Sequence, residues 1–252
     1  LINRPGRFGG FPGGNTPPTD PIKPGLEEIE NFKALLKEAK SYNLSTDKKE
    51  TNLRFEALKG LFDKKQKLFI HCDIVRQILM AIDIKNELDL DVVIVGGQES
   101  YQVAELLKKN NIPVILNQLL NLPTLADDLV DQPYRTPAML QKAGVLFALN
   151  DDDATTRYRN LPYNAGTAAA YGLSKEEALS AITLNAAKIL GVEDRTGSIE
   201  VGKDANIVVS TGDILDMRTN NITHAFIQGR SIELNDKQKQ LYERYKYKYS
   251  LK

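Results

Sequence analysis

Apolar residues recur at helical spacing in the first part of the chain, but only after a segment that has no periodic apolar face. Residues 1–25 are rich in Gly and Pro, a composition that supports turns and extended backbone and predicts an irregular segment. From Leu26 the apolar positions repeat with the period of a helix, which predicts a helix to about Tyr42. A second helical stretch is predicted over 50–62 and is interrupted at Gly60.

Short apolar runs then alternate with helical stretches. Four such runs are predicted strands, and they lie at 67–72, 91–97, 112–116 and 144–150. Strands separated by helices pair in parallel, because each connection must cross over the sheet. Continuous apolar strands are typical of a sheet that is covered on both faces. The pattern therefore predicts an α/β fold, either a doubly wound sheet or a barrel.

The last third of the chain contains one strong helix signal and then changes its period. Ser174 and Glu177 fit a capping box and Gly191 fits a helix stop, so one helix is predicted between them. Residues 195–234 alternate in polarity and carry turn glycines, which predicts antiparallel strands. The charged, tyrosine-rich tail 235–252 predicts a surface helix.

Charge and composition exclude some partners. The 33 basic residues balance the 33 acidic residues, so no overall field favours nucleic acid or an anionic membrane. No run of apolar residues reaches the roughly 20 that a membrane span needs. Cys72 is the single cysteine, which excludes an internal disulfide. The chain begins LINRPGRFGG without Met, and we expect a processed or truncated start.

The segment 172–209, GLSKEEALSAITLNAAKILGVEDRTGSIEVGKDANIVV, resembles the C-terminal signature of the amidohydrolase superfamily, close to its imidazolonepropionase-like branch. Asn206 stands where this family usually has Asp. The resemblance covers about 67–232 and implies the C-terminal half of a (β/α)₈ TIM-type barrel with the return strands of a small composite β-domain. It places strands five to eight at about 67–150. The implied barrel part is 26–194 and the implied β-domain is 195–234.

The ends of the first and last predicted strands carry the candidate chemistry. His71 ends the first strand, and barrel enzymes place functional groups at that end. The resemblance implies that His71 binds a divalent metal, with zinc as the first choice, although a strand-end histidine can also serve only its surroundings. Asp151 and Asp152 follow the last strand, where the family has an aspartate that takes a proton from metal-bound water. Asp151 is the first choice and Asp152 the second, and a polar loop that caps the next helix is the alternative.

Four further residues are candidates for substrate binding. Gly96 and Gly97 end the second strand, where related metal enzymes have a histidine, and they permit close backbone approach to an anion. A nucleotide-binding loop is disfavoured because no G-x-G-x-x-G is present. Arg159 and Asn160 lie in RNLPYNAG, a phrase that recurs in this branch of the family, although both could serve the loop's own backbone. His224 is predicted to be structural.

The resemblance also implies residues that this chain does not contain. The family's first barrel strand carries a His-x-His pair, whereas the histidines here are His71 and His224. One histidine falls short of the three protein ligands usual for a catalytic zinc, so we expect the chain to be inactive alone. A complementary N-terminal segment or a second chain would supply the remaining ligands and the other half of the barrel.

Three hypotheses about function follow. The first is a piece of a metal-dependent amidohydrolase that acts on C–N bonds of a small molecule, such as a cyclic amide or a dipeptide. The second is a degenerate, non-catalytic relative that binds or scaffolds. The third is a stand-alone doubly wound binding domain. Similar sequences are often exported in Gram-negative bacteria, so the resemblance implies a periplasmic location.

Overall fold

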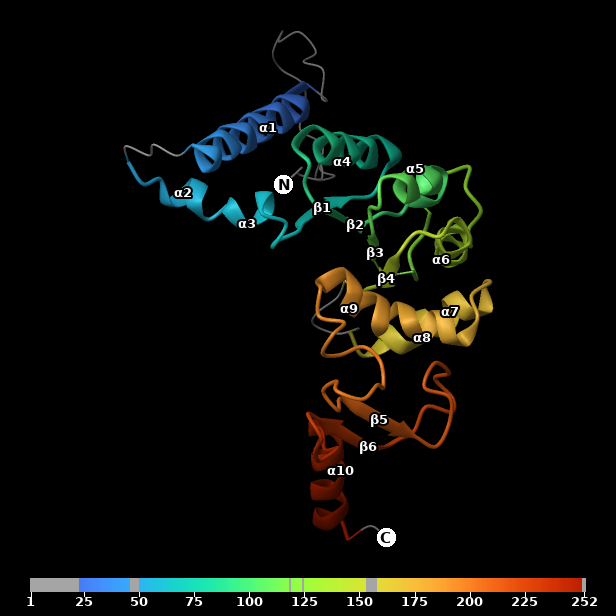
Figure 1. Cartoon of the computed structure of the whole chain (residues 1–252). Coiled ribbons are helices and arrows are strands. Elements are labelled where there is room, and N and C mark those ends of the chain that lie inside the picture. The colour runs from blue at the N-terminus through green and yellow to red at the C-terminus, as the bar shows by residue number, and fades with distance from the viewer. Residues whose placement is uncertain (1–22, 46–49, 118, 124, 153–157, 251–252) are drawn as a thin grey trace, which may run out of the picture. The chain divides into compact units, whose positions relative to one another are not determined.

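The computed structural model describes residues 23–45, 50–117, 119–123, 125–152 and 158–250, which form two compact units (Figure 1). The predicted irregular segment 1–25 therefore lies almost entirely outside the described residues. The first unit takes the described residues up to Leu68 together with Asp83–Asp91. The second unit takes Phe69–Ile82 and the described residues from Val92 onward.

The first unit is helical, and its core lies under the predicted first helix. Its helices are α1 (Lys23–Leu44), α2 (Leu53–Glu56) and α3 (Lys59–Phe62). Leu36 and Ala39 are fully buried, as the helical spacing predicts. Asn52 caps α2, because its side chain accepts hydrogen bonds from the N–H groups of Arg54 and Phe55. Gly60 lies inside α3 rather than at a break, so the predicted interruption is wrong; it falls instead between α2 and α3.

A buried ammonium group holds α1 to the end of a later helix in the same unit. The Lys33 side chain is 9% exposed, hydrogen bonds to Asp83, and lies 3.0 Å from Glu87 and 3.6 Å from Glu30. The Asp83 carboxylate is the main reason that the pKa of Lys33 is raised. A lysine this buried is therefore charged and paired, which is the condition under which buried charges are tolerated.

The second unit is built on a parallel sheet whose strand order follows the chain. The strands are β1 (Leu68–Cys72), β2 (Val92–Gly96), β3 (Val114–Leu116) and β4 (Phe147–Leu149). The connections are α4 (Val75–Leu88), the 3₁₀ turn η1 (Ser100–Val103) with α5 (Ala104–Lys109), and α6 (Gln132–Ala143). All four predicted strands are confirmed, and so is the α/β class. Strands in sequential order with helical crossovers are what part of a (β/α)₈ barrel requires.

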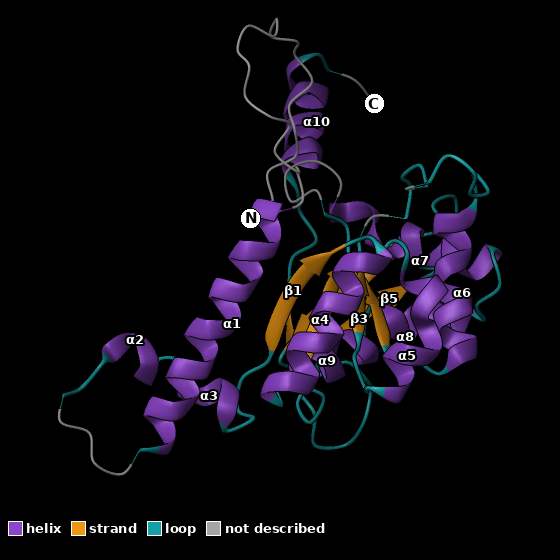
Figure 2. Ribbon diagram, turned by 90° about the horizontal axis from the view of Figure 1, so that it is seen from above, coloured by secondary structure: helices purple, strands orange, loops and turns teal. Residues whose placement is uncertain are grey.

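Both faces of this sheet are covered. Val93 and Ala148 pack against Ile189 of α9 on one face. Ile94, Val114 and Phe147 alternate with them and are fully buried on the other. Figure 1 shows α5 and α6 to the right of the strands and α8 and α9 below them, and Figure 2 shows helices lying over the strands.

The helices after β4 differ from the prediction in one respect. They are α7 (Leu161–Ala170), α8 (Lys175–Ala181) and α9 (Leu184–Leu190). The capping box of Ser174 with Glu177 and the left-handed stop at Gly191 are confirmed. The single helix predicted between them is wrong, because the chain breaks at Thr183 (φ −131°, ψ −91°). The Thr183 hydroxyl donates to the Leu179 carbonyl oxygen at 2.7 Å, a local bond that competes with the helical ladder.

A three-stranded antiparallel sheet follows, as predicted, in the order β5 (Ile207–Ser210), β6 (Ile222–Ile227) and β7 (Arg230–Ser231). The tail forms the helix α10 (Lys237–Lys248), in which no residue is buried. Within the described residues, no helix is long and apolar enough to cross a membrane.

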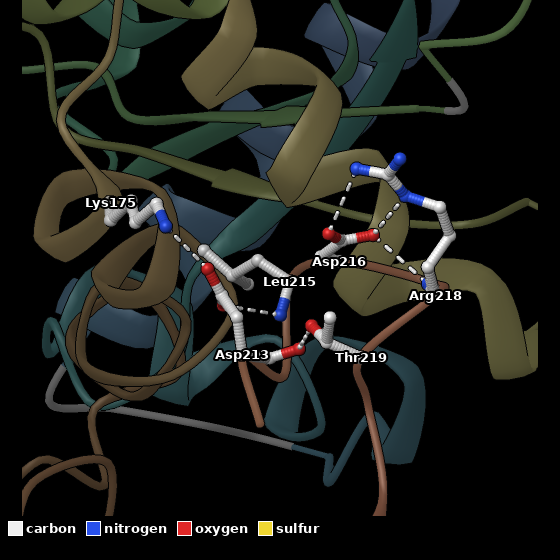
Figure 3. Close-up of polar contacts among 6 residues, drawn as sticks. All are labelled: Lys175, Asp213, Leu215, Asp216, Arg218 and Thr219. Atoms are coloured by element: carbon white, nitrogen blue, oxygen red, sulfur yellow. Dashed lines mark hydrogen bonds and ion pairs between the residues drawn. The ribbon is translucent and has the colours of Figure 1, made fainter.

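The loop between β5 and β6 is tied to the helices after β4 (Figure 3). Lys175 lies 2.6 Å from the Asp213 carboxylate, which also accepts a hydrogen bond from the Leu215 N–H. The hydroxyl of Thr219 donates to the Asp213 carbonyl oxygen at 3.3 Å. A Cβ atom at Gly166 of α7 would lie 2.2 Å from the Leu215 carbonyl oxygen, so only glycine permits this contact.

Candidate functional site

The register of the parallel sheet places His71 in a row with three apolar residues. Val95 pairs with Ile115, and Ile115 pairs with Ala148. The Gly97 N–H donates to the Cys72 carbonyl oxygen at 2.7 Å, a bond that in a parallel ladder pairs Val95 with His71. His71 therefore lies on the face that α9 covers further along the strands.

The next row on the same face, two residues further along each strand, lies at the carboxyl ends. Ladder hydrogen bonds extend the pairing there, because the Asn117 N–H donates to the Gly96 carbonyl oxygen and the Asn150 N–H to that of Leu116. Asn117 and Asn150 therefore stand side by side just beyond β3 and β4. Carboxyl ends of parallel strands are where α/β enzymes place their reactive groups.

The two candidate aspartates have different surroundings. Asp152 is exposed, and its Oδ2 accepts a hydrogen bond from the Asn117 side-chain amide at 3.4 Å. Asp151 is half-buried, and its Oδ2 accepts from the amide of Asn164 at 3.4 Å. Asn164 lies on α7 and is 1% exposed. The structure thus connects Asp152 to the strand-end row and connects Asp151 to a buried helix residue.

His71 is exposed, whereas its neighbour Cys72 is buried, because successive strand residues point to opposite faces. Burial raises the pKa of the Cys72 thiol to about 12, so this thiol is not a nucleophile. In the part of the chain that the structure describes, no three His, Cys, Asp or Glu side chains are grouped to hold a metal ion. The described residues around His71 therefore form no complete metal centre.

The glycine turn at the end of β2 has the positive φ angles that the sequence predicts, but backbone N–H groups in it already donate hydrogen bonds within the protein. Gly96 and Gly97 both have positive φ, at +105° and +62°. The N–H groups of Gly97, Glu99 and Ser100 all donate to backbone carbonyl oxygens. The Glu99 side chain is buried here and accepts from the first N–H of α4, at Val75, at 2.7 Å. These N–H groups are therefore occupied, and the role of the two glycines in substrate binding stays a prediction.

The remaining candidates lie on the 3₁₀ turn η2 (Tyr158–Asn160), at the start of α7 and on β6. Arg159 is exposed in η2, and Asn160 precedes α7 without capping it through its side chain. No hydrogen bond among the described residues joins either of them to His71 or Asp152. His224 is exposed on β6 with Nδ1 3.2 Å from the Thr223 hydroxyl oxygen, away from the parallel strands.

Sequence reasoning missed Asn117, Asn150, Asn164 and Glu99. A signal was present for the first two, because Asn117 directly follows the predicted strand 112–116 and Asn150 is the polar last residue of the predicted strand 144–150. Asn164 and Glu99 gave no comparable signal, because their burial depends on contacts between elements far apart in the chain.

Parallel βα units with polar side chains gathered at the carboxyl ends of the strands define a chain of the α/β fold class. Its family is shown by sequence: a model described as "Amidohydrolase family" matches residues 30–232. The chain belongs to the amidohydrolase family.

Two sequence relatives are similar over shorter stretches. An imidazolonepropionase from Symbiobacterium thermophilum is 34% identical over 101 residues, covering 35% of this chain and 21% of the relative. An imidazolonepropionase from Thermoplasma volcanium is 37% identical over 82 residues, covering 32% of this chain and 20% of the relative. The amidohydrolase of known structure from Thermotoga maritima matches with a TM-score of 0.65 and 33% identity. That match covers 84% of this chain and 54% of the Thermotoga protein, so the chain spans about half the length of this relative.

Proposed function

We propose that the chain is the C-terminal part of a metal-dependent amidohydrolase that hydrolyses C–N bonds in cyclic amides or peptide-like small molecules. The observation that carries this proposal is the placing of His71 and Asp152 at the carboxyl ends of the outer strands of one parallel sheet. Membership of the amidohydrolase family supports the reaction class.

In this proposal His71 supplies one imidazole ligand to a divalent ion, with zinc as the first candidate. When bound, such an ion would supply Lewis-acid activation of a water molecule, whose pKa it would lower to about 7. Asp152 then accepts the proton of the attacking water, since it is exposed while Asp151 is half-buried against Asn164. The remaining ligands come from a complementary N-terminal segment or a second chain. Gly96, Gly97, Arg159 and Asn160 remain the candidates for contact with substrate.

Open sheet edges and exposed apolar side chains on the second unit support the proposal that a further segment pairs with it. β1 and β4 are the edges of the parallel sheet, and open edges of this kind seek further strands. In the antiparallel sheet Val208, Val209 and Ile227 are 52%, 42% and 52% exposed. Exposed apolar side chains on both sides of a strand favour a partner that covers them.

The decisive experiment uses the reading frame that includes all coding sequence upstream of Leu1. We expect this product to contain a His-x-His pair at a predicted strand end, to bind Zn²⁺ with a rise in melting temperature, and to hydrolyse members of a panel of cyclic amides and dipeptides. His71→Ala should abolish the thermal shift and the hydrolysis. The matched control is His224→Ala, which should change neither.

The second candidate is a non-catalytic binding or scaffolding relative, favoured by Gly96 and Gly97 at a place where related metal enzymes have a histidine. This candidate replaces the first if the complete product contains no His-x-His pair and Zn²⁺ leaves its melting temperature unchanged. A product that binds Zn²⁺ through His71 but hydrolyses no panel member leaves the metal site in place and overturns the proposed substrate class.

A further inference from the structure

Two hydrogen bonds connect the side-chain amides of Asn150 and Asn117, at the ends of neighbouring strands, to the Asp152 carboxylate. Nδ2 of Asn150 donates to Oδ1 of Asn117 at 3.2 Å. Nδ2 of Asn117 in turn donates to Oδ2 of Asp152 at 3.4 Å. The ladder bonds place the two asparagines side by side beyond β3 and β4, so this directed chain of hydrogen bonds is held by the sheet itself.

The Asp152 carboxylate determines the donor-to-acceptor direction of both hydrogen bonds in this series. An ionised carboxylate can only accept hydrogen bonds, so Asn117 must turn its NH₂ group toward Asp152. Its oxygen then faces Asn150, which must present its own NH₂ group. Hydrogen bonds in such a series polarise one another, so the bond from Asn150 strengthens the donor that Asn117 offers.

We infer that Asn117 is a positioning residue for Asp152, an inference that rests on the proposed function. Asn117 holds Oδ2, which leaves Oδ1 as the atom that accepts a proton from water. Asp151 is excluded from this role because Asn164 holds its Oδ2, while its Oδ1 is buried and has no partner among the described residues. Hydrogen bonds to catalytic groups are often long in unloaded sites and shorten when substrate binds, which fits the 3.4 Å separation.

The contact can be tested in the 252-residue chain without any activity. In a ¹⁵N-labelled sample titrated between pH 7 and pH 3, the side-chain amide of Asn117, assigned through Asn117→Leu, should shift as Asp152 is protonated. The shift should be lost in Asp152→Asn and kept in Asp151→Asn. An Asn117 amide that does not respond to pH, or that still responds in Asp152→Asn, overturns the inference.

The consequence for catalysis is tested in the complete product. Asn117→Leu removes the donor at similar volume and should lower kcat by about 10–100-fold with little change in KM. The acid limb of its pH profile should be displaced, because a positioning role acts on the carboxylate that this limb reports. Asn150→Leu should move the limb in the same direction by less.

The control is Asn110→Leu, which removes an equivalent amide that donates to the Leu106 carbonyl oxygen at the end of α5. It should leave kcat and the pH profile unchanged. A fall in kcat for Asn117→Leu without movement of the acid limb means a structural role and overturns the inference. If the complete product hydrolyses nothing, the proposed function fails, and the titration alone decides the contact between Asn117 and Asp152.

Discussion

The two sheets of the second unit differ in how they are stabilised. In the parallel sheet β4 is buried along its whole length, and Phe147 has no exposed surface. In the antiparallel sheet the neighbouring residues Val208 and Val209 are 52% and 42% exposed, although they point to opposite sides of β5. The first sheet therefore has helices on both faces, whereas the second is held mainly by its ladder and by the loop that contacts α7.

The chain's own helices cover the parallel sheet, whereas apolar side chains of the antiparallel sheet stay in contact with water. Burial of apolar surface is the main favourable term in folding, so the parallel sheet carries the larger part of the stability of this unit. The antiparallel sheet retains apolar surface that can still be removed from water. Mutations matched between the two sheets can measure the difference directly.

The largest effect is expected in the centre of the parallel sheet. Phe147→Ala should lower the free energy of unfolding by about 3–5 kcal/mol, because it removes a large buried ring and leaves a cavity. Urea denaturation followed by circular dichroism measures this change. A loss below about 1 kcal/mol would show that the parallel sheet is not the stable core.

A matched pair of valines gives the most direct comparison. Val114→Ala, at a fully buried position of β3, should cost about 2–3 kcal/mol. Val208→Ala, at a half-exposed position of β5, should cost less than about 1 kcal/mol. Equal losses at the two positions in the same denaturation experiment would contradict the contrast between the sheets.

The contact between the β5–β6 loop and α7 is expected to have an intermediate effect. Gly166→Ala would bring a methyl group to 2.2 Å from the Leu215 carbonyl oxygen and should cost about 1–3 kcal/mol. The matched control is Gly25→Ala in α1, where a Cβ meets nothing within 4 Å, and this change should stabilise by up to about 1 kcal/mol. Thermal unfolding that shifts in the same direction for both variants would rule out the close contact.

The smallest effect is expected at the exposed ion pair in the same loop. The hydrogen bond from Lys175 is the main reason that the pKa of Asp213 is lowered from its usual value. A lowered pKa in the folded state means that the stabilisation is present above the pKa of the unfolded chain and is lost as the pH falls through the folded value. Lys175→Met should raise the pKa of Asp213 in an NMR titration, with little change in melting temperature. An unchanged pKa would show that the pair does not form in solution.

Local periodicity predicts the elements of this fold, but not the contacts at its site. The four parallel strands and α1 follow from apolar spacing, which is a property of each segment alone. The break at Thr183 does not, because apolar spacing continues through it while a side-chain bond to Leu179 interrupts the helix. The choice between Asp151 and Asp152 also depends on distant partners, Asn164 and Asn117, that only the register of the sheet and the packing of α7 bring near.

The glycine turn after β2 restricts which residues the end of this strand can accept. A side chain at Gly96 would need a φ of +105° and would place its Cβ 2.4 Å from a carboxylate oxygen of Asp73. Gly97 likewise has a φ that a histidine rarely adopts. A substitution that introduced histidine at either glycine would therefore strain the backbone rather than add a ligand. A metal ligand at this strand end would therefore require a different backbone in the turn and a displaced Asp73 side chain, not one substitution alone.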